Sequence, residues 1–244
     1  MTARPLISII TITFNAEKEI TPTLESISRQ TFRNFEHLVI DGASKDSTLA
    51  IIRSSGNARI LSEPDKGLYD AMNKGLRLAK GKYLLFLNAG DAFHSSDTLE
   101  KYAERANAGD DIIYADTVIV DADRTVIKPR HLTAPERLTF ESFAQGMLVC
   151  HQAFMVKAAI APKYDLSWRF SADYDWTVRC IKASDPNRCT NLNITAIDYL
   201  SDGMTDHNKY ASLRERFQIM TRHYGTVPTI LRHFSFLLRA LRRR

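Results

Sequence analysis

The chain has 244 residues, of which 44% are apolar and 25% are charged, a composition typical of a globular protein with a core large enough for an enzyme. No stretch approaches the roughly 18 unbroken apolar residues that a membrane-spanning helix needs. The first residues also lack the basic flank, apolar run and cleavage site of a signal peptide. The sequence therefore predicts a cytoplasmic protein.

The formal charge of +5 comes from one end of the chain. Residues 229–244 contain five arginines and no acid, which leaves 28 basic against 28 acidic residues elsewhere. A groove that follows a nucleic-acid backbone needs basic side chains spread over one face of the fold. The charge distribution therefore argues against nucleic acid as a partner.

Three cysteines are too few for a disulfide framework. Cys150, Cys180 and Cys189 form no CxxC pair. Reduced thiols are therefore expected, and a structural zinc site is not.

The first 91 residues alternate short apolar strands with helical patterns. The strands are expected at residues 6–13, 36–41, 59–61 and 83–87. The helical patterns follow at residues 20–27, 49–52 and 69–79. Strands that alternate with helices at this spacing imply right-handed crossovers, which produce a parallel sheet with helices on both faces. The sequence therefore predicts an α/β fold with a Rossmann-like, mainly parallel central sheet.

The second half of the chain is less regular. Residues 111–114 and 117–120 are predicted to be two strands, the second paired with residues 125–128 across the turn at 121–123. Residues 132–149 are expected to form a loop or a short helix. A strand over 151–156 and a helix over 172–183 follow.

Polar side chains follow each strand of the first half where that strand ends. These residues are Asn15, Asp41, Asp65 and Asp91. Ligands of open parallel sheets gather at the carboxyl ends of the strands. Four polar strand ends together therefore predict a ligand site at this edge of the sheet.

Asp41 is the candidate for recognition of a base. A carboxylate at a strand end can accept the imide N–H of a uracil ring. The alternative is a turn residue, because aspartate is common in turns. Ser44 and Asp46 are expected to cap the helix that follows, whose N-terminus could also face phosphate oxygens.

The loop at residues 88–91 is the candidate for a metal site. It follows a fully apolar strand, so Asp91 is expected to project into a cleft. Departure of a nucleoside diphosphate leaves negative charge, which Mg²⁺ or Mn²⁺ held by a carboxylate and the phosphates neutralises. Gly90 allows close approach of the backbone to the ligand. The alternative is a simple Asn-Gly-type turn.

Together these motifs resemble the family-2 glycosyltransferase series. The matching segments run in the same order as in the family: Thr13-Phe14-Asn15, residues 40–46, Gly67 with Ala71 and Asn73, Gly81-Lys82-Tyr83, and Asn88-Ala89-Gly90-Asp91. The resemblance implies the GT-A fold, an activated sugar donor that is usually a UDP-sugar, and inversion at the anomeric carbon. It also implies a 1–224 catalytic domain, with a nucleotide-binding half over 1–91 and an acceptor-binding half over 92–224.

The resemblance also assigns roles to residues. Asp41 matches the base-binding aspartate, and Asp91 matches the last aspartate of the metal-binding DxD motif. The nucleotide-binding residues that we expect are Thr13, Phe14, Asn15, Glu17, Asp41, Ser44, Asp65, Lys66, Asn73, Asn88, Ala89 and Gly90. The family usually has an acid where Asn88 and Gly90 stand, so the metal must gain ligands elsewhere. The segment over 63–73 is similar to a subgroup that acts in surface-polysaccharide assembly.

Asp173 is the candidate general base. An inverting transfer is a single in-line displacement, which needs one base to deprotonate the acceptor hydroxyl. Asp173 matches the position that supplies this base in the family, although Ala172 replaces the usual glutamate. The alternative for Asp173 is a helix N-cap.

Four further residues are candidates for the acceptor side or the metal. The resemblance places His151 and Gln152 on the acceptor side, although a lone histidine is more often structural. Trp176 is interpreted either as a core residue or as a platform for a sugar ring. His207, in a polar segment after Gly203, is a candidate to complete the metal site.

Residues 225–244 predict a basic amphipathic helix that starts near Pro228. Its apolar side chains fall on one side, and its arginines fall on the other. This pattern is typical of a helix that lies on an anionic membrane, and equally of a helix packed on the body. Attachment to the inner membrane face would bring the protein to a polyprenyl-linked acceptor.

The sequence therefore predicts a metal-dependent inverting glycosyltransferase of cell-surface polysaccharide biosynthesis. Its expected donor is a nucleotide sugar, and its expected acceptor is a saccharide or a lipid-linked saccharide. The rival interpretation is a non-catalytic nucleotide-sugar binder, because acids are lost at Asn88, Gly90 and Ala172. A dinucleotide-dependent oxidoreductase is disfavoured because residues 14–17 are not a GxGxxG turn.

Overall fold

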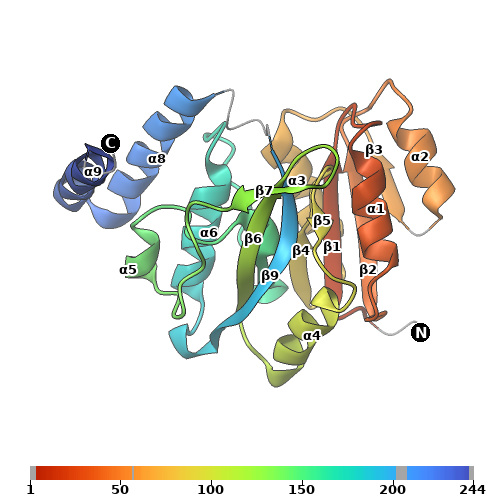
Figure 1. The fold of residues 1–244 in the computed structure, drawn as a ribbon, viewed down its shortest axis with the longest axis horizontal. Helices are drawn as coiled ribbons and strands as arrows, with labels where there is room; N and C mark the ends of the chain where they lie inside the picture. Colours follow the sequence, from red (N-terminus) through yellow and green to blue (C-terminus); the bar gives the residue numbers. More distant parts are fainter. Residues whose placement is uncertain (1–3, 57, 202–207, 242–244) are drawn as a thin grey trace.

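The computed structural model describes residues 4–56, 58–201 and 208–241 (Figure 1). Its first half contains β1 (Ile7–Thr13), α1 (Ile20–Ser28), β2 (Phe35–Asp41), α2 (Thr48–Ser55), β3 (Arg59–Ser62), α3 (Leu68–Leu78) and β4 (Tyr83–Phe86). Every residue of β1 is buried, as its run of β-branched side chains requires for a central strand. The alternation of strands and helices predicted for this half is confirmed.

The second half continues with a mixture of short and long elements. These are β5 (Ala92–Phe93), α4 (Thr98–Ala108), β6 (Ile112–Val120), β7 (Val126–Pro129), α5 (Phe140–Phe143), η1 (His151–Ala153), β8 (Phe154–Lys157), η2 (Ala158–Ile160), α6 (Ala172–Ala183), η3 (Pro186–Arg188), β9 (Cys189–Leu200), α8 (Lys209–Tyr224) and α9 (Thr226–Leu241). The helix at α6, the short helix at α5 and the β6–β7 hairpin are confirmed.

Two strand predictions for this half are wrong in detail. The two strands expected at 111–114 and 117–120 form the single strand β6, whose register to β9 shifts near Asp116. The strand expected from residue 151 begins only at Phe154, because residues 151–153 form a 3₁₀ turn. Bulges and short turns depend on neighbouring strands, so periodicity alone does not reveal them.

Among the described residues, the strands form one sheet in the order β3-β2-β1-β4-β8-β6-β9-β5, with β7 paired to β6. The pairs β3-β2, β2-β1 and β1-β4 are parallel. Strand β8 then runs antiparallel between β4 and β6, and β9 returns parallel to β6. The parallel half therefore ends at β4, and the antiparallel strand β8 joins it to the second half.

Among the described residues, the two largest of three hydrophobic clusters lie on opposite faces of this sheet. Alternation along β1 sends Ile10 and Ile12 to the core shared with α3 and α6. The same alternation sends Ile7 and Ile9 to the core shared with α1 and α4. Figure 1 shows these helices on the two sides of the sheet. Both faces of the central strands are thus covered, and the strand ends remain as the place for a site.

The C-terminal helices α8 and α9 extend the molecule beyond α6 (Figure 1). Helix α8 is joined to α6 by Asp175, which accepts hydrogen bonds from His223 Nε2 and Arg179 Nε at 2.7 Å each. Helix α9 begins at Thr226 and holds Pro228 in its first turn, so the predicted C-terminal helix is confirmed. Within the described residues, no helix is both long and apolar enough to span a bilayer.

Candidate functional site

A cavity of about 1210 Å³ opens at the carboxyl ends of β1 and β4. One wall is formed by the end of β1, the start of α3 and the loop over 88–91. The opposite wall is formed by the β6–β7 turn, η1, the first turn of α6, the end of β9 and one residue of α8. The cavity therefore lies where the polar strand ends predicted a ligand.

The turns after β1 and β2 are joined by polar side chains. Asn15, whose φ of 47° is left-handed, accepts a hydrogen bond from Lys45 N at 2.9 Å and donates its own N–H to Ser44 Oγ at 2.8 Å. The buried Asp41 accepts hydrogen bonds from Ser44 and from Ser62 Oγ, the latter at 2.6 Å. Asn15 thus joins the two turns, and Asp41 joins the turn after β2 to the end of β3.

The residues predicted to bind the nucleotide divide into two groups. Half of them line the cavity: Thr13, Phe14, Asp65, Asn88, Ala89 and Gly90. The other half lie outside its lining: Asn15, Glu17, Asp41, Ser44, Lys66 and Asn73. Several residues of this second group bind other parts of the chain instead. The role of Asp41 in base binding stays a prediction, since its carboxylate is buried and already hydrogen-bonded.

Three of the residues outside the cavity have clear structural partners. Glu17 accepts a hydrogen bond from Ser47 N at 2.9 Å. Asn73 exchanges hydrogen bonds with the main chain of Tyr164, at 2.8 Å and 3.0 Å. The expectation that Ser44 caps α2 is wrong, because Ser47 is the N-cap residue and Ser44 bonds to Asp41.

Asp91 lies in the cavity wall and is only 4% exposed. Its Oδ2 accepts a hydrogen bond from Gln152 Nε2 at 3.0 Å, and its Oδ1 accepts one from Leu200 N at 3.1 Å. Burial raises the pKa of Asp91 to about 7, against these hydrogen bonds and the charge of Arg124. Gln152, predicted for the acceptor side, therefore contacts the candidate metal ligand directly.

Gly90 is required at its position by conformation and by space. Its φ of 96° lies in the region that side-chain-bearing residues rarely adopt. A Cβ on Gly90 would lie 2.8 Å from Leu200 Cδ2, at the end of β9. The loop over 88–91 therefore packs closely against the second half of the chain.

The residues around Asp91 suit a metal only if the substrate supplies most of the ligands. Among the described residues, no group of three or more histidine, cysteine, aspartate or glutamate side chains is placed to hold an ion. His207 lies outside the described residues. A single carboxylate with diphosphate oxygens is the arrangement that these residues allow for Mg²⁺ or Mn²⁺.

Asp173 projects into the cavity from the first turn of α6. Its Oδ1 accepts a hydrogen bond from the Tyr69 hydroxyl at 3.1 Å. The alternative that Asp173 caps the helix is wrong, because the N-cap residue is Ser171. The carboxylate therefore keeps acceptor capacity on the cavity side, as a proton-accepting group needs.

His151 also lines the cavity and is buried. Its Nε2 pairs with the Tyr164 hydroxyl at 2.5 Å. Burial lowers the pKa of His151 to about 4, against the charge of Asp173, so the ring is neutral at pH 7. His151 can thus exchange hydrogen bonds with a ligand without adding charge to the site.

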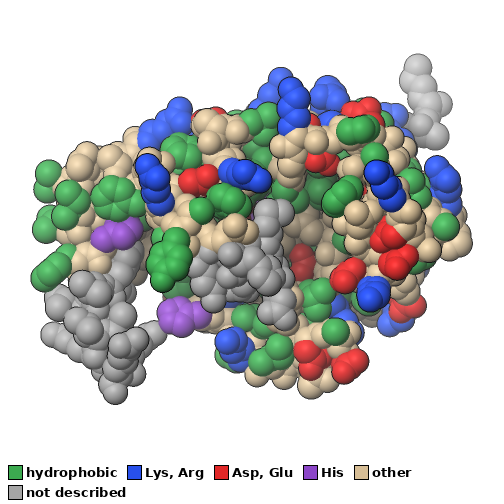
Figure 2. Space-filling model, turned by 90° about the horizontal axis from the view of Figure 1, so that it is seen from above, with side chains coloured by type: hydrophobic (Ala, Val, Ile, Leu, Met, Phe, Trp, Pro, Cys, Tyr) green, Lys and Arg blue, Asp and Glu red, His purple; other side chains and the backbone are tan. Residues whose placement is uncertain are grey.

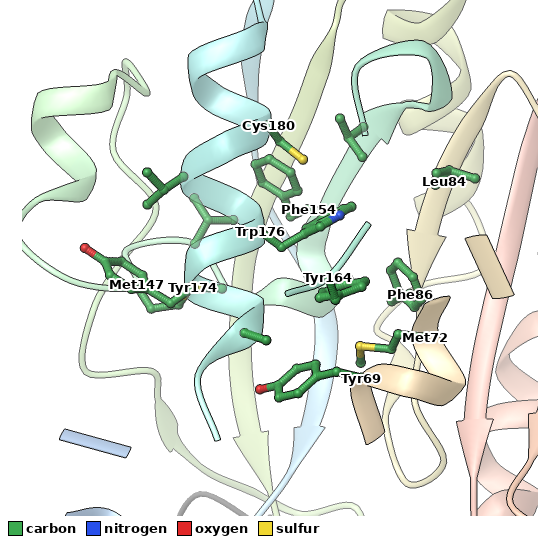
Figure 3. Close-up of a cluster of buried hydrophobic side chains, with 14 of the residues drawn as sticks. Tyr69, Met72, Leu84, Phe86, Met147, Phe154, Tyr164, Tyr174, Trp176 and Cys180 are labelled. Carbon is green, nitrogen blue, oxygen red and sulfur yellow. The ribbon is translucent and has the colours of Figure 1, made fainter. Parts of the chain in front are cut away.

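Trp176 is a core residue and does not line the cavity. Its ring is fully buried, stacks on Tyr164 with 5.0 Å between centroids, and donates from Nε1 to Pro162 O at 2.7 Å. Figure 3 shows it inside the cluster of Phe86, Phe154 and Tyr164. The prediction of Trp176 as an acceptor-side residue is therefore wrong, because its position on α6 points into the core.

Three arginines and a glutamate on the cavity wall were not predicted from the sequence. Arg124 comes from the β6–β7 turn, Arg130 follows β7, Arg216 comes from α8, and Glu19 precedes α1. Arg130 donates to the carbonyl oxygens of residues 132, 147 and 148. The local sequence contained a signal only for Arg124, as a basic residue inside the tight turn at 121–124. The other three residues reach the cavity through packing between elements that are distant in the sequence.

Several polar atoms at the cavity have no hydrogen-bond partner. Within the described residues, the buried unpaired atoms of cavity-lining side chains are Thr13 Oγ1, Asn88 Oδ1, Arg124 Nη2 and Arg216 Nε. Buried polar groups are normally paired, by protein, water or a ligand. These four atoms therefore leave polar groups on the cavity wall that water or a polar ligand can pair.

Comparison with protein families and curated proteins identifies relatives over most of the chain. The model of "Glycosyl transferase family 2" matches residues 8–161. The PGL/p-HBAD biosynthesis glycosyltransferase of Mycobacterium bovis is 35% identical over 189 residues, which cover 73% of this chain and 70% of that protein. An uncharacterized glycosyltransferase of Mycobacterium tuberculosis is 33% identical over 216 residues, covering 86% and 80%.

Solved structures share the fold. The crystal structure of S. aureus TarS 1-349 in complex with UDP superposes with a TM-score of 0.72 at 20% identity, covering 94% of this chain and 72% of that one. Glucosyl-3-phosphoglycerate synthase from Mycobacterium tuberculosis, solved with Mn²⁺ and UDP, gives 0.62 at 15% identity, covering 90% and 80%. The expected GT-A fold class is confirmed, and this chain belongs to glycosyl transferase family 2.

Proposed function

We propose that the protein transfers a sugar, with inversion, from a UDP-sugar to a saccharide or lipid-linked saccharide of cell-surface polysaccharide biosynthesis. The observation that carries this proposal is one cavity lined by both Asp91 and Asp173. The first comes from the nucleotide-binding half and the second from the acceptor-binding half. A cavity of about 1210 Å³ has room for a nucleotide sugar and the end of an acceptor.

The base and diphosphate of the donor fit the wall formed by the first half. The ring of Phe14 is 61% exposed at the end of β1, where a base can stack on it. Asp65 lies beside it, with its Oδ2 only 2.6 Å from where a Cβ on Gly42 would be. The absence of a side chain on Gly42 therefore leaves space for the Asp65 carboxylate next to Phe14.

A divalent cation between Asp91 and the diphosphate would neutralise the charge of the leaving group. Mn²⁺ is present in the structural relative with UDP named above, and in a mannosyltransferase from Pyrobaculum calidifontis solved with GDP-Man and Mn²⁺. That second structure gives a TM-score of 0.58 at 15% identity, covering 98% of this chain and 65% of that one. We infer the same requirement here, with Asp91 as the one carboxylate of the loop that binds the ion.

Asp173 acts as the general base. It takes the proton of the acceptor hydroxyl while that oxygen forms a bond to the anomeric carbon. The bond from this carbon to the diphosphate oxygen breaks in the same step, and its electron pair leaves with the nucleoside diphosphate. Tyr69 orients the Asp173 carboxylate through its 3.1 Å hydrogen bond. The hydrogen bond from Tyr69 leaves other lone pairs of the carboxylate to accept the proton, which supports this role.

The direct test is a transfer assay with UDP-, GDP- and dTDP-sugars, with and without Mn²⁺. We expect a UDP-sugar with Mn²⁺ to raise the melting temperature, since ligands stabilise the state that they bind. We also expect slow hydrolysis of that donor, and transfer with inverted anomeric configuration by NMR once an acceptor is supplied. Retention of configuration, or stabilisation only by GDP- or dTDP-sugars, would contradict the proposal.

A non-catalytic nucleotide-sugar binder is the second candidate function. It is favoured by the neutral residues Asn88, Gly90 and Ala172 at positions that are usually acidic in the family. A binder is expected to show the same thermal stabilisation by the donor but no hydrolysis of it. The hydrolysis assay therefore separates the two functions without knowledge of the acceptor.

We also propose that α8 and α9 attach the protein to an anionic membrane surface. Large apolar side chains of these helices are exposed, namely Tyr210, Leu213, Val227, Ile230, Leu231 and Phe234. Figure 2 shows hydrophobic side chains gathered at this end of the molecule. The sequence adds arginines at 239 and 242–244. Apolar and basic residues together are what binding to anionic lipid needs.

Vesicle sedimentation tests this attachment. The full chain is expected to pellet with anionic vesicles and much less with neutral ones. The double variant Leu231→Glu with Phe234→Glu is expected to remain in the supernatant. The matched control is Leu166→Glu, because Leu166 is 52% exposed but lies between η2 and α6. Equal sedimentation of all three proteins would contradict the proposal.

A further inference from the structure

The turn between β6 and β7 contains an arginine where a glycine would fit more easily. Arg124 has a φ of 64°, in the left-handed region. The turn is closed by Arg124 N donating to Asp121 O at 3.0 Å and by Thr125 N donating to Asp121 Oδ1 at 2.8 Å. Neither bond uses the Arg124 side chain. Left-handed backbone is unfavourable for most residues with a side chain, so an arginine here has a conformational cost that a glycine in the same turn would avoid.

The side chain of Arg124 reaches from this turn to the loop over 88–91. Its Nη1 donates to the Gly90 carbonyl oxygen at 2.6 Å, and the residue lines the cavity. Its Nη2 is buried and has no hydrogen-bond partner. Nη1 of the guanidinium is thus held by the loop that carries Asp91. Nη2 lies beside the same loop and has an N–H donor that no protein group accepts.

The charges at this loop explain what such a donor can bind. Asn88 and Gly90 are neutral, so Asp91 is the one acid of the loop. A nucleoside diphosphate brings several negative charges, and a cation held by a single carboxylate neutralises only part of them. A guanidinium is always charged and matches phosphate oxygens with fixed N–H directions.

We propose that Arg124 binds the diphosphate of the sugar donor through Nη2. This inference rests on the proposed function. Arg124 stabilises the charge that builds on the departing phosphate oxygen when the bond to the anomeric carbon breaks. It supplies positive charge at a loop that has fewer acids than the family pattern to hold a metal.

The test compares binding of UDP and uridine to the full chain and to Arg124→Gly. Glycine accepts the left-handed backbone, so this variant removes the charge without disturbing the turn. Isothermal titration in the presence of Mn²⁺ is expected to show a weakening of UDP binding by about 10- to 100-fold, the size of a hydrogen bond to a charged group. Uridine, which lacks the diphosphate, is expected to bind with an affinity within about twofold of the wild type.

A matched control removes a nearby charge outside the cavity. Lys128 is exposed on β7 of the same hairpin and is absent from the cavity lining. Lys128→Gln is expected to bind UDP like the wild type. The loss of the bond to Gly90 O is expected to lower the melting temperature of Arg124→Gly slightly. Titrations well below that melting temperature therefore ensure that weaker binding is not a result of unfolding.

Three outcomes would overturn the inference in distinguishable ways. Unchanged UDP binding by Arg124→Gly shows that Nη2 does not contact the diphosphate. Equal weakening of UDP and uridine shows that Arg124 only supports the loop at Gly90. If the wild type binds no nucleoside diphosphate in titrations with UDP, GDP and dTDP, the proposed function itself fails, and this inference fails with it.

Discussion

The two walls of the cavity are built in different ways. The wall from the first half consists of successive strand-to-helix turns, each a few residues after a parallel strand. The opposite wall takes one or two residues each from the β6–β7 turn, η1, α6, β9 and α8. The first wall follows from local chain direction, whereas the second depends on elements that are far apart in the sequence.

The difference shows which parts of the site tolerate variation. Parallel strands bring their ends to one edge whatever the loop residues are, so the wall from the first half is a property of the fold. The opposite wall requires β8 to run antiparallel and α6 to dock with α8. We therefore expect changes at the opposite wall to separate function from stability more sharply than changes at the first.

The largest effect is expected for Asp173→Asn. Asparagine keeps the size of the side chain but cannot take a proton, so transfer is expected to fall by about 10²- to 10⁴-fold. Titration with UDP should give the wild-type affinity, because the proposed role places Asp173 at the acceptor hydroxyl and not at the diphosphate. Full transfer rates in this variant would remove Asp173 from the role of base.

Asp175→Asn, two residues along the same helix, is expected to show the opposite pattern. Asp175 is buried and bonds to His223 and Arg179, so the variant is expected to lose about 2–3 kcal/mol of unfolding free energy in chemical denaturation. Its transfer rate per folded molecule is expected to be near the wild type. Asp173→Asn serves as its control, and similar stability losses in both variants would contradict the assignment.

The same residue predicts a dependence on pH. Burial alone would raise the pKa of Asp175, but the His223 hydrogen bond and the Arg179 charge lower it below its usual value. A lowered folded-state pKa gives stability that is present above the unfolded pKa of about 3.9 and is lost as pH falls through the folded value. The stability difference between wild type and Asp175→Asn is therefore expected to shrink below about pH 4.

Gly90→Ala is expected to have a smaller effect, on both stability and UDP binding, because Gly90 lies where the two walls meet. The left-handed φ and the contact with Leu200 should cost about 2 kcal/mol of stability and should also weaken UDP binding. The control is Gly56→Ala, whose φ is 75° but whose Cβ would meet nothing within 4 Å. That control is expected to lose some stability and no UDP affinity. Wild-type UDP affinity in Gly90→Ala would argue that the loop does not face the diphosphate.

Trp176→Phe is expected to have the smallest effect. It removes the hydrogen bond to Pro162 O and part of the stack on Tyr164, which should cost about 1–2 kcal/mol of unfolding free energy. The KM for the acceptor should stay within about twofold of the wild type, because the ring lies in the core. A large rise in that KM without loss of stability would restore the interpretation as a sugar platform.

The residue pattern was sufficient for the first half of the fold. Buried β-branched strands with helical segments between them allow few arrangements other than a parallel sheet, so β1 to β4 were predicted within a few residues. The second half was predicted less well, and β9, α4 and α8 were not predicted at all. Strand β9 is half-buried along most of its length and pairs with two different strands, β6 and β5. Its alternation of apolar and polar residues is therefore weak.

The site divides in the same way. The sequence alone identified two acidic side chains as candidates for the chemistry, one after β4 and one at the start of α6. It also identified the family to which the chain belongs. Only the tertiary structure decided which side chains reach the cavity. It directed Trp176 and Asn73 to structural partners and brought Gln152 and Arg124 to the loop around Asp91. Local sequence sets the identity of a side chain and the backbone near it, whereas its neighbours depend on packing between distant elements.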